Sequence, residues 1–263
     1  MYRQDGYLLT TGRFVDGAEQ LVVTLTDGPR RLASVVGVDE HADLAVLAID
    51  IADLGVAADW SRPSLGSSIS LVGRPGNKSS IVSGSVRAVS VRERLPAGTA
   101  IDGLILTDVP AMAEMSGGAV VGDDGSVVGL VNTMPFEETA HSTGAGAVAA
   151  PVVEVIAEQI IADGTVRHAY LGVEISCAQL RRGQEVRSWW RSRLGVEPAG
   201  PASLAGLDAG DVITAIGSTE VASVATLVGS LRERRPGELV TLRVHRENVE
   251  QVRVRLGSMP SGE

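Results

Sequence analysis

Short runs of apolar residues, broken by turn residues, fill the first half of the chain. Each run has the length and the β-branched content of a strand. The runs cover residues 20–26, 31–39, 43–50, 68–73, 81–91, 103–107, 117–122 and 126–132. Asp27-Gly28 and Asp124-Gly125 lie between two such runs, which is the pattern of a tight hairpin. Many short strands at this spacing, without helices between them, predict a sandwich or barrel.

The period of the pattern changes after residue 150. The apolar residues of "PVVEVIAEQIIADG" (151–164) recur at the spacing of one helical face. Pro151 suits the first helical turn and Gly164 suits the stop. We therefore expect a helix that closes a β-rich domain at 1–163, followed by a linker at 164–169.

A second unit is predicted at 170–257, and residues 258–263 are expected to form a disordered tail. Apolar and polar residues alternate in the stretches 238–246 and 250–256, so each predicted strand has one buried and one wet face. An amphipathic helix around Val224–Leu231 precedes them and ends at Pro236-Gly237. The tail "GSMPSGE" contains little that could pack.

The composition of the chain argues against several classes of function. The hydrophobic share of 44% and the charged share of 21% are ordinary for a globular protein, and the net charge of −9 argues against a nucleic-acid partner. Cys177 is the only cysteine, which excludes an intrachain disulfide. Acidic residues are scattered and no phosphate-binding glycine loop occurs, so we expect neither a metal nor a cofactor. No signal peptide or membrane span is visible in the chain as written.

The stretch "AEMSGGAVV" (113–121) holds one serine before two glycines at the mouth of a strand. Many hydrolases expose a nucleophile in this way. A serine hydroxyl at its free pKa is a weak nucleophile, so Ser116 would need a base beside it.

The second unit resembles a PDZ domain of the kind attached to bacterial proteases. The resemblance rests on "YLGV" (170–173), on "PAGPASLAGLDAGDVITAIGSTEV" (198–221) and on the later "RPGELVTLRV". It implies that a peptide C-terminus adds as a strand while backbone N–H groups hold its carboxylate. The residues implied in peptide binding are Tyr170, Leu171, Gly172, Val173, Glu174 and Ile175.

The first unit resembles the trypsin-like half of the HtrA/Deg family. The stretches "DGYLLTTGRFV" (5–15), "HADLAVLAID" (41–50) and "ILTDVPAMAEMSGGAVV" (105–121) carry the resemblance. It implies a mainly β fold: a trypsin-like double β-barrel followed by a PDZ domain. The N-terminal barrel is incomplete, and the chain passes from the first barrel to the second near 60–67. Asp43 then falls on the triad aspartate and Ser116 on the nucleophile, whereas the histidine position holds Arg13.

Two departures from the family affect catalysis. Arginine has no acceptor nitrogen and stays protonated, so Arg13 cannot serve as the base. In the oxyanion region, Glu114 stands where the family has a glycine, and Met115 precedes Ser116. Loss of one oxyanion donor lowers the rate by on the order of 10²–10³. With histidine absent, we expect Arg13 and Asp43 to form an ion pair with N···O within about 4 Å.

These observations favour an inactive protease homologue that binds unfolded or C-terminal peptide segments in quality control or signalling at the cell envelope. One alternative is an active serine endopeptidase that uses Ser116 with a base from elsewhere, such as His141, His41, His168 or His245. Another is a PDZ scaffold with a vestigial barrel. Trp189 and Trp190 are expected to pack over the PDZ sheet, or else to contact a peptide or the protease domain.

The start of the sequence also departs from the family, which carries further barrel strands and a signal or anchor before the position of Asp5. An incomplete start is therefore expected, because an opened barrel exposes strand edges. The full protein would then be exported or membrane-anchored. The resemblance also implies a homo-oligomer, a trimer in family members.

Overall fold

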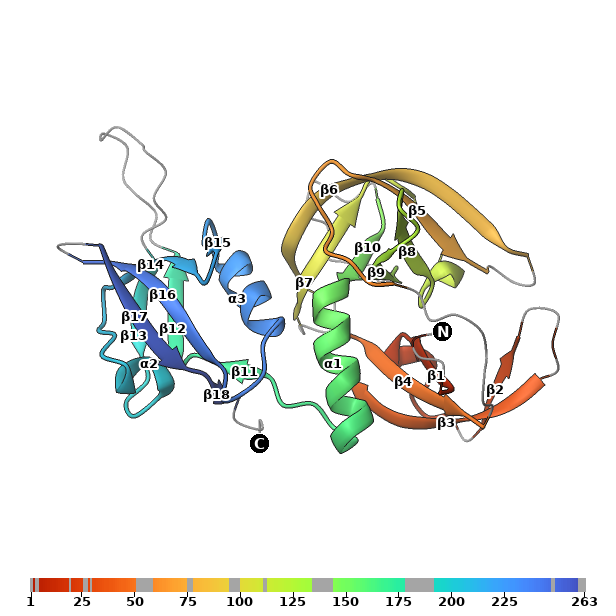
Figure 1. Cartoon of the computed structure of the whole chain (residues 1–263), viewed down its shortest axis with the longest axis horizontal. Helices are drawn as coiled ribbons and strands as arrows, with labels where there is room; N and C mark the ends of the chain where they lie inside the picture. The colour runs from red at the N-terminus through yellow and green to blue at the C-terminus, as the bar shows by residue number, and fades with distance from the viewer. Residues whose placement is uncertain are drawn as a thin grey trace. The chain divides into compact units, whose positions relative to one another are not determined.

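Figure 1 shows a computed structural model of the chain. It describes residues 2, 5–18, 20–25, 28, 30–50, 59–74, 78–94, 100–110, 113–133, 144–177, 192–246 and 249–259. The chain forms two compact units, Met1–Val166 and Arg167–Glu263. Trp189, Trp190 and His141 lie outside the described residues.

The first unit begins with a four-stranded antiparallel sheet in the order β1-β4-β3-β2 (Figure 1). Its strands are β1 (Tyr7–Thr10), β2 (Leu21–Thr24), β3 (Arg30–Asp39) and β4 (Leu44–Ile49). The central strand β4 is buried along most of its length, on both faces. Ala45 and Leu47 pack in a small cluster with Val15, whereas Leu44 and Val46 join the main core of the unit.

The second part of this unit is a closed six-stranded barrel in the order β10-β7-β6-β5-β8-β9. Its strands are β5 (Ser68–Gly73), β6 (Ser80–Arg94), β7 (Ala100–Thr107), β8 (Ala119–Gly122), β9 (Val127–Asn132) and β10 (Gly146–Ala149). Leu71, Ile105, Val120 and Val131 are fully buried inside it. Closure pairs every strand with two neighbours and leaves no free edge. The predicted barrel is thus confirmed.

Helix α1 (Ala150–Asp163) runs past both the four-stranded sheet and the barrel (Figure 1). Val152, Ile156 and Ile160 on its apolar face are buried against residues such as Leu44 of β4. Gly164 ends the helix in the left-handed conformation, with φ 73°, and its N–H donates to the carbonyl of Ile160 at 2.8 Å. This helix unites the first sheet and the barrel around one core.

The second unit contains short strands, a four-stranded sheet in the order β15-β14-β16-β17 and two helices. Its elements are β11 (Ala169–Tyr170), β12 (Val173–Cys177), β13 (Ser192–Val196), α2 (Pro201–Leu204), β14 (Val212–Ile216), β15 (Thr219–Glu220), α3 (Val224–Arg232), β16 (Leu239–His245), β17 (Val249–Arg255) and β18 (Gly257–Ser258). The predicted alternation holds in β16, where Val240, Leu242 and Val244 are buried. No helix in the described residues is long and apolar enough to cross a membrane.

The ends of this unit differ from the sequence-based boundaries. Ala169, which we placed in a linker, and Ser258, which we placed in a disordered tail, are direct partners in the β11–β18 pair. The N–H of Met259 continues this pairing by donating to the carbonyl of His168 at 2.8 Å. The sequence pattern missed this pair because two residues per strand are too few to show a period.

Candidate active site

Ser116 lies in a tight turn between a 3-10 helix, η2 (Ala113–Met115), and strand β8. Its relative exposure is only 8%. Two close approaches explain the glycines that follow. A Cβ on Gly117, which has φ +80°, would lie 2.8 Å from Oγ1 of Thr10, and a Cβ on Gly118 would lie 2.4 Å from the carbonyl oxygen of Val72. Both contacts are tighter than real side chains make, so this turn demands glycine at each position.

Arg13 and Asp43 face each other as the sequence predicted. Arg13 belongs to a second 3-10 helix, η1 (Gly12–Phe14), and Asp43 directly precedes β4. The Nη1 atom of Arg13 donates to Oδ2 of Asp43 at 2.9 Å, and the backbone N–H of Arg13 donates to Oδ1 at 2.9 Å. The expected ion pair is therefore confirmed. Asp43 is 7% exposed.

Two residues at the end of β9 complete the site, and the sequence analysis did not find them. Asn132 is fully buried; its Nδ2 donates to Oδ2 of Asp43 at 3.2 Å, and its Oδ1 accepts from Nη1 of Arg13 at 3.2 Å. Thr133 contacts Ser116. The one signal in the sequence was the polar pair Asn132-Thr133 at the end of an apolar run. That run forms β9, which pairs with β8, the strand that follows Ser116.

The hydroxyl of Ser116 is saturated with hydrogen bonds. It accepts from Nη2 of Arg13 and from the backbone N–H of Thr133, the latter at 2.9 Å. The two hydroxyl oxygens of Ser116 and Thr133 are 2.5 Å apart, and Oγ1 of Thr133 lies 3.1 Å from the carbonyl of Ala113. The carbonyl of Ala113 can only accept, so the hydroxyl of Thr133 donates to it, and Ser116 is left as the donor between the two hydroxyls. Both lone pairs of Ser116 are thus occupied.

The backbone N–H of Ser116 is also engaged. It donates to the carbonyl of Ala113 at 3.2 Å, closing the 3-10 turn. In acyl transfer such an N–H points toward the oxyanion that forms in the transition state. Of the other two residues assigned to the oxyanion region, Glu114 is exposed and Met115 is fully buried. In this conformation the turn does not offer the Ser116 donor to a substrate.

The electrostatics of the pair follow from its burial. Burial raises the pKa of the Asp43 carboxyl above its ordinary value, while the N–H and the charge of Arg13 and the amide of Asn132 act to lower it. Burial likewise lowers the pKa of Arg13, and the charge of Asp43 partly offsets this effect. Every partner of the Asp43 oxygens is a donor, which fits the ionised carboxylate.

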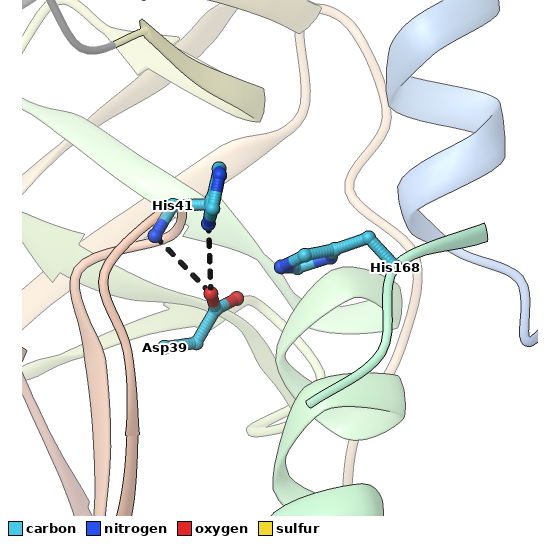
Figure 2. A group of neighbouring side chains, drawn as sticks. All are labelled: Asp39, His41 and His168. Carbon is cyan, nitrogen blue, oxygen red and sulfur yellow. Dashed lines mark hydrogen bonds and ion pairs between the residues drawn. The ribbon is translucent and has the colours of Figure 1, made fainter. Parts of the chain in front are cut away.

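No histidine in the described part of the chain bonds to Ser116. His41 pairs with Asp39: its backbone N–H donates to Oδ1 at 3.1 Å and its Nδ1 lies 3.6 Å from the same atom (Figure 2). His168, also drawn in Figure 2, belongs to the second unit, as does the exposed His245 of β16. Arg13 therefore takes the place next to Ser116 that a base would need.

The predicted peptide-binding segment of the second unit forms a buried turn and the start of β12. Leu171 is 1% exposed, and the carbonyls of Leu171 and Gly172 accept from Ala202 at 2.9 Å and Glu197 at 3.0 Å. Gly172 has φ +74°. In the described residues β12 pairs only with β13, so its other edge has no strand partner there. Val173 is half-buried, Glu174 is exposed, and the side chain of Ile175 is outside the described set.

Tyr170 is the first residue of this segment and the last residue of β11. Its hydroxyl donates to Oε2 of Glu197 at 2.8 Å, and this bond raises the pKa of the tyrosine. The bond ties β11 to the residue that follows β13, so Tyr170 supports the turn from outside.

Comparisons with known protein families match both units. A model described as trypsin-like peptidase domain matches residues 1–130, and a PDZ domain model matches residues 169–256. A curated relative from Bartonella henselae, "Probable periplasmic serine endoprotease DegP-like", is 31% identical over 278 residues, covering 98% of this chain and 52% of the relative. A relative of the same description from Halomonas elongata is 30% identical, covering 99% and 56%. The chain thus spans about half the length of these relatives.

Solved structures show the same likeness. The HtrA-type protease AlgW with a tripeptide gives a TM-score of 0.71 at 27% identity, covering 100% of this chain and 89% of that one. AlgW with a decapeptide gives a TM-score of 0.68 at 28% identity, covering 100% and 82%. The likeness to these two structures extends over the whole of this chain.

Proposed function

Because the chain belongs to the HtrA/Deg family of trypsin-like serine proteases with a PDZ domain, we propose that it is an inactive member that binds C-terminal or unfolded peptide segments. The observation that carries the proposal is the guanidinium of Arg13, which bonds both Asp43 and Ser116. A triad needs a group there that takes the serine proton and is held by the aspartate. A guanidinium has donors only, so it fills this position without that function.

The turn around Ser116 adds a second obstacle to catalysis. The serine N–H is used inside η2, and the hydroxyl lone pairs are used by Arg13 and Thr133. Attack on a peptide carbonyl would need at least one of these bonds to break before the reaction begins. Loss of one oxyanion donor alone lowers the rate by on the order of 10²–10³. The base and the oxyanion donor are thus both compromised.

Peptide binding is assigned to the segment 170–175 of the PDZ unit. Strand β12 offers an edge to which an extended peptide can add, and the turn at Leu171 and Gly172 lies at the start of that edge. The AlgW structures are described as complexes with a tripeptide and a decapeptide, which supports the same ligand class here. We assign this segment a free C-terminal carboxylate with an apolar last side chain.

The cellular setting is proposed from the relatives, whose description is periplasmic. An exported protein that recognises exposed chain ends would act in quality control or signalling at the cell envelope. A homo-oligomer is part of the same proposal and is tested by light scattering of the full-length product.

The rival function is an active endopeptidase, and the presence of Ser116 and Asp43 favours it. The decisive experiment is labelling of the wild-type chain with a fluorophosphonate probe, together with hydrolysis of unfolded casein. We expect no labelling beyond that of the Ser116→Ala control and no casein fragments. Efficient labelling of Ser116 in the wild-type chain would establish the rival function and end the proposal of inactivity.

A further inference from the structure

A pocket of about 370 Å³ opens beside Arg13 in the first unit. Its volume falls in the range of small-ligand sites. Arg13 and Asp43 of the candidate active site line the pocket, whereas Ser116 does not. The lining is apolar at Val15, Val35 and Val38 and acidic at Asp16 and Glu40.

The apolar wall of the pocket continues a buried cluster. Val35 and Val38 of β3 pair with Leu47 and Ala45 of β4, and directly paired residues share one face of a sheet. Leu47 and Ala45 are buried with Val15, whereas Val35 and Val38 remain 42% and 39% exposed. Two valines at the margin of a core are therefore in contact with water, and an apolar ligand would gain by covering them.

The charge of the pocket is negative. Asp16 and Glu40 are exposed, and neither belongs to an ion pair in the part of the chain that the structure describes. The other charged residues of the lining, Arg13 and Asp43, neutralise each other. The carboxylates of Asp16 and Glu40 therefore make the electrostatic potential of the pocket negative. They repel an anion and attract a cation.

We propose that this pocket binds the side chain of a lysine in an unfolded polypeptide segment, an inference that rests on the proposed peptide-binding function. Lysine combines a four-carbon apolar stem with a compact charge that has three donors. The stem covers Val35 and Val38, and the ammonium group lies at Asp16 and Glu40. The pocket would give the first unit a preference for basic segments that does not depend on a free chain end.

The test is an NMR titration of the full chain with the capped peptide acetyl-Ala-Leu-Lys-Leu-Ala-amide. Its amidated end removes the carboxylate that the PDZ unit is proposed to hold. We expect shifts at the methyl groups of Val35 and Val38. The Asp16→Asn/Glu40→Gln variant should bind roughly tenfold more weakly. The control variant Asp59→Asn/Asp123→Asn removes the same charge from exposed positions elsewhere in the unit and should bind like the wild type.

A matched peptide with acetyl-lysine isolates the ammonium group. The proposal is overturned if this peptide binds as tightly as the lysine peptide, if both double variants weaken binding equally, or if the shifts fall only in the second unit. Binding of free-acid peptides to the PDZ unit is a separate readout. A failure of that readout would contradict the proposed function and leave the titration of Val35 and Val38 interpretable.

Discussion

Replacing Arg13 by alanine is expected to destabilise the first unit by about 2–3 kcal/mol. The substitution removes side-chain hydrogen bonds to Asp43, Asn132 and Ser116 at once. Breaking a fully buried ion pair costs about 3–5 kcal/mol because it leaves an uncompensated charge. Here the Arg13 side chain is 26% exposed, and Asp43 keeps the bonds from the residue 13 N–H and from Asn132, which reduces the cost.

Native-state hydrogen exchange on the full chain measures this loss, because it reports each unit separately. Amides in β4 and β9 should exchange faster in Arg13→Ala, while those in β16 serve as an internal reference in the second unit. Arg31→Ala deletes an exposed arginine of β3 and is the matched control. Adding Asp43→Asn to the Arg13→Ala variant should recover part of the loss, because it removes the uncompensated charge.

The loss should also depend on pH. Burial raises the pKa of Asp43 in the folded chain, so its contribution to stability is present below the unfolded pKa and is lost as the pH rises through the folded pKa. Removing the positive charge of Arg13 raises the folded pKa further. The difference between variant and wild type should therefore be largest at neutral pH and should shrink in acid. A loss below about 0.5 kcal/mol, or one that is constant with pH, would refute the ion pair as a stabilising contact.

Other substitutions test the remaining assignments. Arg13→His alone should leave casein hydrolysis at background, because the N–H of Ser116 is still used within its turn; substantial turnover would show that the turn opens readily. Calorimetry should give tighter binding for a free-acid peptide than for its amidated twin, and equal affinities would argue against carboxylate capture near Gly172. Gly118→Ala should destabilise the first unit by about 1–3 kcal/mol or more, since its Cβ would meet the Val72 carbonyl at 2.4 Å; an unchanged urea midpoint would contradict this packing.

Much of the fold was readable from the sequence because the pattern was regular. The run 68–73 became β5 with the same bounds, and the face predicted for 151–164 packs the core as helix α1. The hydrophobic periodicity did not predict the β11–β18 pair. Each of these strands has only two residues, and the two strands lie far apart in the chain. Long-range pairs of this size carry no local signal.

Only part of the candidate active site could be predicted from the sequence. Arg13 and Asp43 were paired correctly because a buried carboxylate without its histidine needs another donor. Asn132 and Thr133 were missed, since polar residues after a strand are ordinary at a loop. Their importance comes from the β8–β9 register, which brings the end of β9 alongside the serine turn. A linear sequence shows neither that register nor the direction in which the hydroxyl proton of Ser116 points.

The glycines after Ser116 have a consequence for how such sequences are read. The Val72 carbonyl excludes a side chain at residue 118 whether or not any peptide bond is ever cut. Purifying selection on folding alone would therefore keep Gly117 and Gly118 after the serine even in a lineage that no longer hydrolysed peptide bonds. A search that treats the letters Ser-Gly-Gly as the hallmark of a working enzyme would count its descendants as proteases. If the proposal of inactivity holds, the residue that separates the two groups lies 103 positions earlier, at Arg13.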